Sequence, residues 1–305
     1  MMDLDEIEQQ ILREVAGIDG RPEGAYNFRL NGKSVGRQSS TNIEVSTSPD
    51  GLNIHVAPHT HGEVVHIPVI ISASGLTELV RNNFHIGQDC EVTIVAGCGI
   101  YNCGTKDSVH DGVHSFYVGK NSRVRYIEKH YGAGPGAGKI LNPVTRVEQE
   151  PGSYVEIQTE QLRGVDSTRR ETSALLANDT KILIHERLLT HGRQDAESTI
   201  SVELAGHDSV ANIVSRSVAQ DESRQLFRSQ ITGKNACRGH SECDAIIMNK
   251  AQVSAIPSLD AQCPDAELIH EAAIGKIAGE QITKLMSLGL SRAQAESQIV
   301  NGFLR

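Results

Sequence analysis

The chain of 305 residues carries a formal net charge of −9, with 38% hydrophobic and 22% charged residues. This composition is typical of a folded protein that can bury a substantial core, and it excludes a chain that is disordered as a whole. The acidic balance, the 4% of aromatic residues and the lack of Trp argue against broad nucleic-acid binding, which needs basic stripes and stacking rings.

The N-terminal sequence "MMDLDEIEQQILREVAG" is acidic and lacks the basic and apolar regions of a signal peptide. No apolar run reaches the ~18 residues that cross a bilayer. We therefore expect a cytoplasmic protein with no membrane partner. In that reducing compartment the six cysteines are expected to be buried, reactive or metal-binding rather than paired in disulfides.

The first predicted element is a short amphipathic helix, because apolar residues recur at helical spacing between residues 4 and 15. These residues are Leu4, Ile7, Ile11, Leu12 and Val15. We assign residues 1–40 to this helix and its lead-in.

From about residue 42, segments recur in which a turn rich in Gly, Asn, Asp or Ser precedes alternating apolar residues. They include "GQDCEVTIV" from Gly87, "GKNSRVRYI" from Gly119, "PGSYVEIQT" from Pro151, "ANDTKILIH" from Ala177 and "GHDSVANIV" from Gly206. Their starts lie roughly 26 to 32 residues apart, as in stacked repeats. An antiparallel sandwich stays open as an alternative, but most of the repeats lack its Asn-Gly or Asp-Gly turns. The pattern favours a β-solenoid core over residues 41–264.

Past Pro264 the pattern becomes helical, in a region that we assign to residues 265–305. "GEQITKLMSLGL" has a one-sided apolar face, and Ser291 begins "SRAQAESQIVNGFL" with Gln294 at the capping-box position. The segment "DAELIHEAAIGKI" is compatible with either a helix or a strand.

The stretch "NACRGHSECDAIIM" gathers Cys237, His240 and Cys243, which raises the possibility of a zinc site. On a strand the two thiols would face one side and the imidazole the other, and no second C-x2-C pair follows. A closed zinc knuckle is therefore disfavoured, and a buried thiol before an apolar strand is the plainer interpretation. Further on, His270 and Glu271 are adjacent and diverge, so they would reach a common site only with help from another element or subunit.

The stretch "VAGCGIYNCG" predicts a glycine-rich loop after a strand, which holds Cys98 and Cys103. The flanking glycines would let backbone or substrate approach closely, although an ordinary turn with two thiols explains the pattern equally well. His110 and His114, four residues apart, are a weak metal signal because the local pattern is strand-like.

The last third of the chain resembles the SufB/SufD family of iron–sulfur cluster assembly proteins. The resemblance rests on "CDAIIM", on "AIPSLDAQCPDAELIHEAAIGKI" and on "GEQITKLMSLGLSRAQAESQIVNGFL", which follow in unbroken order over about residues 240 to 304. Upstream, "GCGIYNCGTKDSVHDGVHSFYVGKNSRVRYIEKHYG" is similar to the family's glycine-cysteine stretch, but the residues after Cys98 depart from the usual Thr-Ala-Pro. The chain is similar to a compact form of the family.

The resemblance implies an all-β fold, a right-handed parallel β-helix with a short N-terminal helix and a C-terminal helical region. It also implies a two-fold dimer, either a homodimer or a heterodimer with a SufB/SufD paralogue, and a SufC-type ABC ATPase bound by the C-terminal helices. The family builds clusters at the dimer interface, which implies Cys243, His270 and Glu271 as the assembly and metal-binding residues. Sulfur from a donor is thought to enter at Cys98, and finished clusters pass to apoproteins.

These residue types suit the implied chemistry, because thiolates bind iron–sulfur clusters and can carry sulfur as a persulfide. An incomplete thiolate set would also release its cluster more readily than four cysteines. We therefore expect a scaffold rather than an enzyme, with a transient iron–sulfur cluster and a reduced flavin as a further candidate in the complex. The alternatives are a cytoplasmic β-helix enzyme acting on carbohydrate and a structural partner of the ATPase that binds no cluster.

Overall fold

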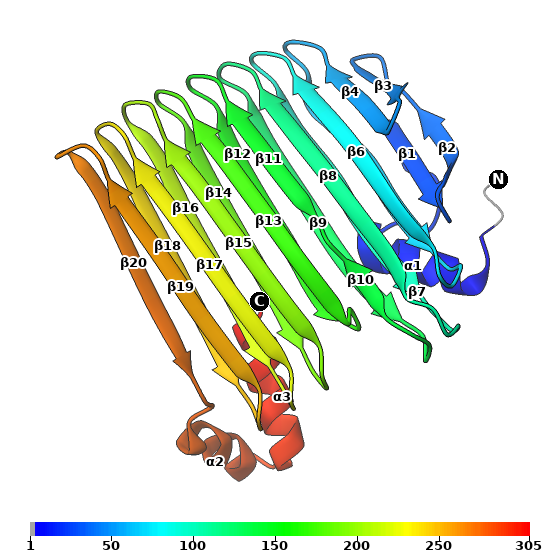
Figure 1. The fold of residues 1–305 in the computed structure, drawn as a ribbon, viewed down its shortest axis with the longest axis vertical. Helices are drawn as coiled ribbons and strands as arrows, with labels where there is room; N and C mark the ends of the chain where they lie inside the picture. Colours follow the sequence, from blue (N-terminus) through cyan, green and yellow to red (C-terminus); the bar gives the residue numbers. More distant parts are fainter. Residues whose placement is uncertain (1–3) are drawn as a thin grey trace.

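The computed structural model describes residues 4–305. In that part of the chain two long, mainly parallel sheets run side by side, and successive coils contribute a strand to each sheet in turn (Figure 1). The coils form a β-solenoid of about eight turns, with one short N-terminal helix and further helices at the C-terminus. This confirms the predicted parallel β-helix in place of an antiparallel sandwich.

The first sheet, sheet A, contains in spatial order β2 (Lys33–Gln38), β1 (Ala25–Leu30), β5 (His61–Ile71), β7 (Glu91–Tyr101), β9 (Arg123–Ala133), β12 (Tyr154–Arg163), β14 (Lys181–Thr190), β16 (Ser209–Ala219), β18 (Cys237–Ile247) and β20 (Ala266–Gly275). Sheet B contains β3 (Ile43–Ser48), β4 (Gly51–Val56), β6 (Thr77–Ile86), β8 (Ser108–Val118), β10 (Lys139–Leu141), β11 (Val144–Gln149), β13 (Ser167–Leu176), β15 (Asp195–Leu204), β17 (Arg224–Gly233) and β19 (Gln252–Ala261). Strands thus extend beyond both ends of the 41–264 segment, and the segment left open between helix and strand forms β20.

The coils stack because each strand alternates an inward apolar residue with an outward one. In β14, for example, Ile182 and Ile184 are buried and lie beside Ala211 and Ile213 of β16. Parallel in-register pairing repeats this match from coil to coil, so inward residues form continuous rows along the interior. Residues that are far apart in the sequence therefore become neighbours within one inward row.

A geometry that recurs at one corner of the coils explains why Cys237 is buried. At this corner a hydroxyl donates to the main-chain carbonyl three residues earlier, as Ser153 Oγ does to Glu150 O at 2.7 Å and Ser209 Oγ to Gly206 O at 2.8 Å. Cys237 lies directly beside Ser209 in the next coil and is buried at the same place. It therefore fills a structural corner position, as the plain interpretation of its sequence predicted.

The N-terminal helix α1 (Glu6–Ala16) begins at a capping box between Asp5 and Glu8 and buries Ile11, Leu12 and Val15. Its contacts are with β5, β7 and β9, so it covers the outside of sheet A near the first coils. The predicted amphipathic helix is confirmed.

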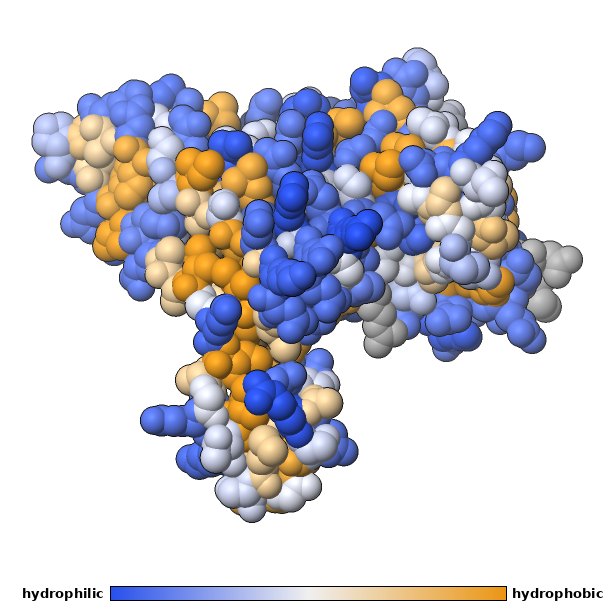
Figure 2. Space-filling view, turned by 60° about the horizontal axis from the view of Figure 1, so that its bottom comes forward, coloured by the Kyte–Doolittle hydropathy of each residue, from blue (hydrophilic) through white to orange (hydrophobic). Residues whose placement is uncertain are grey.

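The chain ends in α2 (Gly279–Ser287) and α3 (Arg292–Phe303), and α3 begins with the predicted capping box between Ser291 and Gln294. Val300 and Leu304 pack against Val218 of sheet A. Figure 2 shows the helical pair protruding from the solenoid, with hydrophobic residues visible where it joins the body. No helix in residues 4–305 is both long and apolar enough to span a membrane.

Candidate functional site

Cys243 lies on β18 with its side chain pointing into the solenoid, where it is 1% exposed. Cys237 faces the same side and His240 the other, as strand alternation predicted. Burial raises the pKa of the Cys243 thiol to about 12, and the carboxylates of Glu186 and Asp244 add to the increase. At neutral pH the Cys243 side chain is therefore a protonated thiol. A cation such as iron would have to displace this proton to bind the sulfur.

His270 lies on β20, the next and last strand of sheet A, and also points inward. It is aligned with Ser241, while Cys243 is aligned with Ala272. A strand spacing of ~4.8 Å and a rise of ~3.3 Å per residue place the α-carbons of Cys243 and His270 roughly 8 Å apart on one inner face. Both ring nitrogens of His270 are buried and have no hydrogen-bond partner among the described residues. Such an imidazole is costly unless something binds it.

Glu271 points to the opposite, outer face, where its Oε1 lies 3.3 Å from His240 Nε2. His240 is also within 3.2 Å of Asn212 through its other ring nitrogen. The three predicted assembly residues are therefore divided, with Cys243 and His270 inside and Glu271 outside. In the described part of the chain no group of three or more His, Cys, Asp or Glu residues is arranged to hold a metal ion.

The end of the solenoid beside these residues is uncovered. β19 and β20 are terminal strands of their sheets, so each has one edge without a neighbouring strand in residues 4–305. Their surfaces are largely exposed and include Ile269, which is 56% exposed, and Ile256, which is 48% exposed. Unpaired strand edges with apolar side chains are ready to pair with another chain.

The second predicted cysteine, Cys98, is inside a strand and not in the expected loop. It lies on β7, points inward and is 2% exposed, whereas Cys103 is exposed in the turn that follows. The flanking glycines face outward under α1. A Cβ on Gly99 would come 2.1 Å from Ile11 Cγ2, and one on Gly97 would come 2.8 Å from Val15 O. These glycines make room for the N-terminal helix, because any side chain there would push it away.

Cys98 lines a small internal cavity of about 10 Å³, which has room for about one water molecule. Polar side chains share its wall, and they are His110, His114, Glu128 and His130. Burial raises the pKa of the Cys98 thiol well above its ordinary value, and the charges of Glu78 and Glu128 raise it further. Cys98 is therefore a buried thiol beside a small, histidine-rich chamber.

A buried polar row connects the region of this chamber with Cys243. Along one inner row of sheet A, Glu128, Thr159, Glu186, Ser215 and Cys243 are successive neighbours in successive coils. Ser215 Oγ donates to Glu186 Oε2 at 2.9 Å. The row runs through the five successive strands β9, β12, β14, β16 and β18 of sheet A.

Arg170 of sheet B crosses the interior and lies near both carboxylates of this row. Its guanidinium pairs with Glu128 and lies 3.7 Å from Glu186, and it donates to His130 Nδ1 at 3.1 Å. All four side chains are buried. Sequence reasoning missed this row, although charged residues at alternate positions of otherwise apolar strands, as in "YIEKHYG", signal it.

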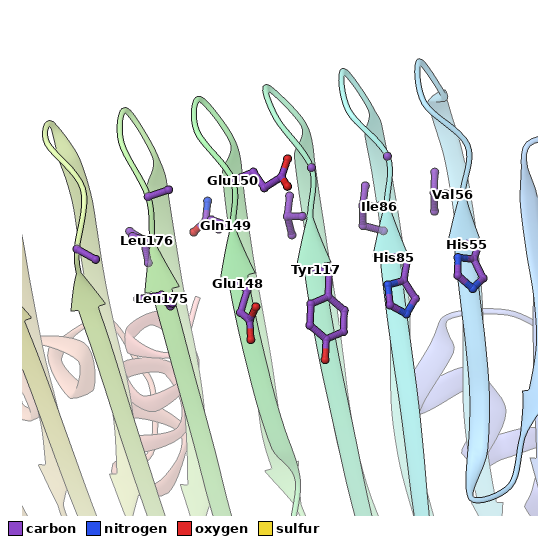
Figure 3. A pocket seen from close by; sticks show the side chains of 15 residues that line it. His55, Val56, His85, Ile86, Tyr117, Glu148, Gln149, Glu150, Leu175 and Leu176 are labelled. Carbon is purple, nitrogen blue, oxygen red and sulfur yellow. The ribbon is translucent and has the colours of Figure 1, made fainter.

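A larger hollow lies elsewhere, on the outer face of sheet B (Figure 3). It has a volume of about 570 Å³ and holds none of the predicted site residues. His55 and His85 stack at 4.6 Å between ring centroids, and Tyr117 stacks on His85 at 4.9 Å. Aligned rings on successive coils thus stack along the wall of this hollow.

Comparison with known proteins identifies the family of this chain. Residues 69–303 match the family model described as "SUF system FeS cluster assembly, SufBD core domain". The chain therefore belongs to the SufB/SufD family of iron–sulfur cluster assembly proteins.

Curated relatives carry the same family name. An iron–sulfur cluster assembly SufBD family protein of Archaeoglobus fulgidus is 31% identical over 227 residues, which cover 74% of this chain and 60% of the relative. A SufBD family protein of Methanothermobacter thermautotrophicus is 28% identical over 71% of this chain and 53% of its own length. A chloroplastic member from Arabidopsis thaliana is 25% identical over 70% of this chain and 40% of its own length. The chain thus spans little more than half the length of the first two relatives.

Proposed function

We propose that this protein is a scaffold subunit of the SUF system, on which an iron–sulfur cluster is built at the open end of the solenoid and passed to apoproteins. The observation that carries the proposal is the placement of Cys243 beside His270, at an end of the solenoid where strand edges are uncovered. Both ring nitrogens of His270 are buried and have no hydrogen-bond partner among the described residues. The protein would act as a platform and not as an enzyme. The cluster is its cargo.

A second chain would complete the site. One chain offers a thiol and an imidazole on the inner face and the carboxylate of Glu271 on the outer face, which is too few ligands in one place for a cluster. Pairing through β19 and β20 would cover the exposed Ile256 and Ile269 and bring two such sets together. A homodimer and a heterodimer with a paralogue both meet this requirement.

The α2–α3 pair is the surface that we propose for a SufC-type ATPase. It projects from the solenoid body (Figure 2) and exposes Leu288, which is 75% exposed, and Met286. Exposed apolar side chains on a protruding helical pair fit a groove on a partner protein. ATP hydrolysis would then take place in the partner and move the scaffold through these helices.

Cys98 is the residue that we propose to accept sulfur from a donor protein, and the buried polar row leads from its chamber to Cys243. Glu128, Glu186 and Ser215 would give a polar sulfur species hydrogen-bonding partners along the interior. A reduced flavin as electron source and a cytoplasmic location stay predictions from the sequence.

Reconstitution with ferrous iron and sulfide under anaerobic conditions tests the assignment. Cys243→Ala is expected to abolish cluster absorbance while the dimer persists in native mass spectrometry. Cys237→Ser is the matched control, because a hydroxyl suits that corner position and should leave cluster formation unchanged. Normal cluster formation by Cys243→Ala would overturn the site. A wild-type complex that binds the ATPase but never holds iron would instead favour a structural partner without a cluster.

A further inference from the structure

The chamber around Cys98 contains a histidine that is oriented by a carboxylate. His110 Nδ1 lies 3.0 Å from Glu78 Oε1, and both side chains are buried, with His110 5% exposed. Glu78 is also paired with Arg29 at 3.2 Å. Burial would raise the pKa of Glu78, but the hydrogen bond and charge of His110, together with Arg29, lower it overall. Glu78 is therefore an ionised, acceptor-only group at neutral pH.

This pairing fixes the tautomer of His110. An ionised carboxylate can only accept, so Nδ1 must carry the hydrogen and Nε2 of the neutral ring must carry the lone pair. Nε2 has no hydrogen-bond partner among the described residues, and it lies over Gly112, where a Cβ would be 3.1 Å away. Gly112 and His110 both line the cavity that Cys98 lines from the opposite sheet. The missing side chain at Gly112 therefore leaves open the space between imidazole and thiol.

The other histidines of the chamber are engaged differently. Nδ1 of His114 lies 3.3 Å from the Tyr126 hydroxyl, and burial lowers the pKa of His114 to about 4. His130 is held by Arg170 through Nδ1 and has Glu128 3.6 Å from Nε2. Only His110 combines a carboxylate behind one ring nitrogen with a lone pair facing the cavity, among the residues that the structure describes.

We propose that Cys98, His110 and Glu78 form a sulfur-transfer site, in which His110 is the general base for Cys98 and Glu78 positions His110. The substrate class is a persulfide. This proposal rests on the proposed role of Cys98 in accepting sulfur. The buried Cys98 thiol needs a base that removes its proton, because only the thiolate is nucleophilic. His110 is that base.

The step balances without an added oxidant or reductant. His110 Nε2, directly or through one water, takes the proton of the Cys98 thiol. The thiolate attacks the outer sulfur of the donor persulfide, so that a new S–S bond forms at Cys98 as the S–S bond of the donor breaks. The donor leaves as a thiolate, to which the proton on His110 can pass, and Cys98 is left as a persulfide. The arrangement parallels the thiol–imidazole–carboxylate logic of other nucleophilic sites.

The titratable and charged groups around His110 are Arg29 of β1, Glu78 of β6, Cys98 of β7, His114 of β8 itself, Glu128 and His130 of β9, and Arg170 of β13, which pairs with Glu128. Each variant therefore changes only one of these groups, and its pH profile is compared with that of the wild-type protein.

The test measures persulfide formation at Cys98 by mass spectrometry after exposure of the full-length protein to cysteine persulfide, between pH 6.5 and 9.5. His110→Asn keeps an amide donor for Glu78 but has no base. Its rate at pH 7 is expected to fall about a hundredfold, the size of a typical general-base contribution, and to approach the wild-type rate at high pH. Glu78→Gln should shift the pH profile to higher pH with a smaller loss. His114→Gln, in the same chamber, is the matched control and should react at the wild-type rate.

The proposal is overturned if His110→Asn reacts like wild type at pH 7, if its loss is equal at every pH, or if His114→Gln loses as much. His110→Gln replaces His110→Asn if circular dichroism shows that the latter does not fold. If wild-type Cys98 takes up no sulfur, its proposed role as sulfur acceptor fails. The base is then tested separately by the pH dependence of iodoacetamide alkylation at Cys98, where the same order of variants is expected.

Discussion

Replacing Arg170 by Met should destabilise the solenoid strongly, because it leaves two buried carboxylates without their positively charged neighbour. In the native protein the guanidinium pairs with Glu128 and lies 3.7 Å from Glu186, and all three side chains are buried. Removing one partner of a buried ion pair costs about 3–5 kcal/mol, since the remaining charge is left unpaired away from water. Met fills most of the volume, so the loss reports on charge rather than on a cavity.

The sign of the pH dependence follows from the same geometry. Burial would raise the pKa of Glu128, but the charges of Arg170 and His130 hold it well below its usual range, so the wild-type pair stays ionised in mild acid. Without Arg170, burial dominates and the folded-state pKa of Glu128 rises above its unfolded value. Stability of the variant is then intact below the unfolded pKa of Glu128 and is lost as the pH rises, by up to about 1.4 kcal/mol per pH unit.

Urea unfolding followed by circular dichroism at pH 5 and pH 7 measures both effects. The difference between wild type and Arg170→Met should be larger at pH 7 than at pH 5, and adding Glu128→Gln to the variant should recover part of the loss. A loss below about 1 kcal/mol at pH 7, or an equal loss at both pH values, would show that the interior row is hydrated and that the buried-charge reasoning is wrong.

Three further outcomes are expected. Gly99→Ala should cost about 1–3 kcal/mol in urea unfolding, because its Cβ would lie 2.1 Å from Ile11 Cγ2 of α1; Gly20→Ala, where nothing lies within 4 Å, should have no such cost, and equal effects would contradict the packing of α1. Ser291→Ala removes the acceptor for the Gln294 main-chain amide and should lower the stability of α3 by about 1 kcal/mol, seen as faster hydrogen exchange confined to the C-terminal helices. Since the pKa of the Cys243 thiol is about 12, iron binding there must release a proton. Calorimetry should therefore show affinity rising about tenfold per pH unit between pH 6 and 8, and an unchanged affinity would mean that Cys243 is not the ligand.

The sequence alone determined the parts of the fold that depend on local patterns. The amphipathic spacing of Ile11, Leu12 and Val15 predicted α1, the Ser291–Gln294 pair predicted the start of α3, and the recurring turns predicted the solenoid. Alternation along a strand was also enough to place Cys243 and His240 on opposite faces. These features are fixed within a few residues, where backbone geometry leaves little choice.

Only the tertiary structure decided which residues meet. Cys98 was expected in a loop because glycines flank it, but those glycines accommodate α1, which is more than 80 residues earlier in the chain. The pairing of His110 with Glu78 and of Arg170 with Glu128 arises from the stacking of the coils, which brings together residues 32 and 42 positions apart in the sequence. The open end at His270 exists because no further strand follows β20 in the sheet. A one-residue shift in register would reverse every inward and outward side chain, so these contacts depend on the whole stack and not on any local pattern.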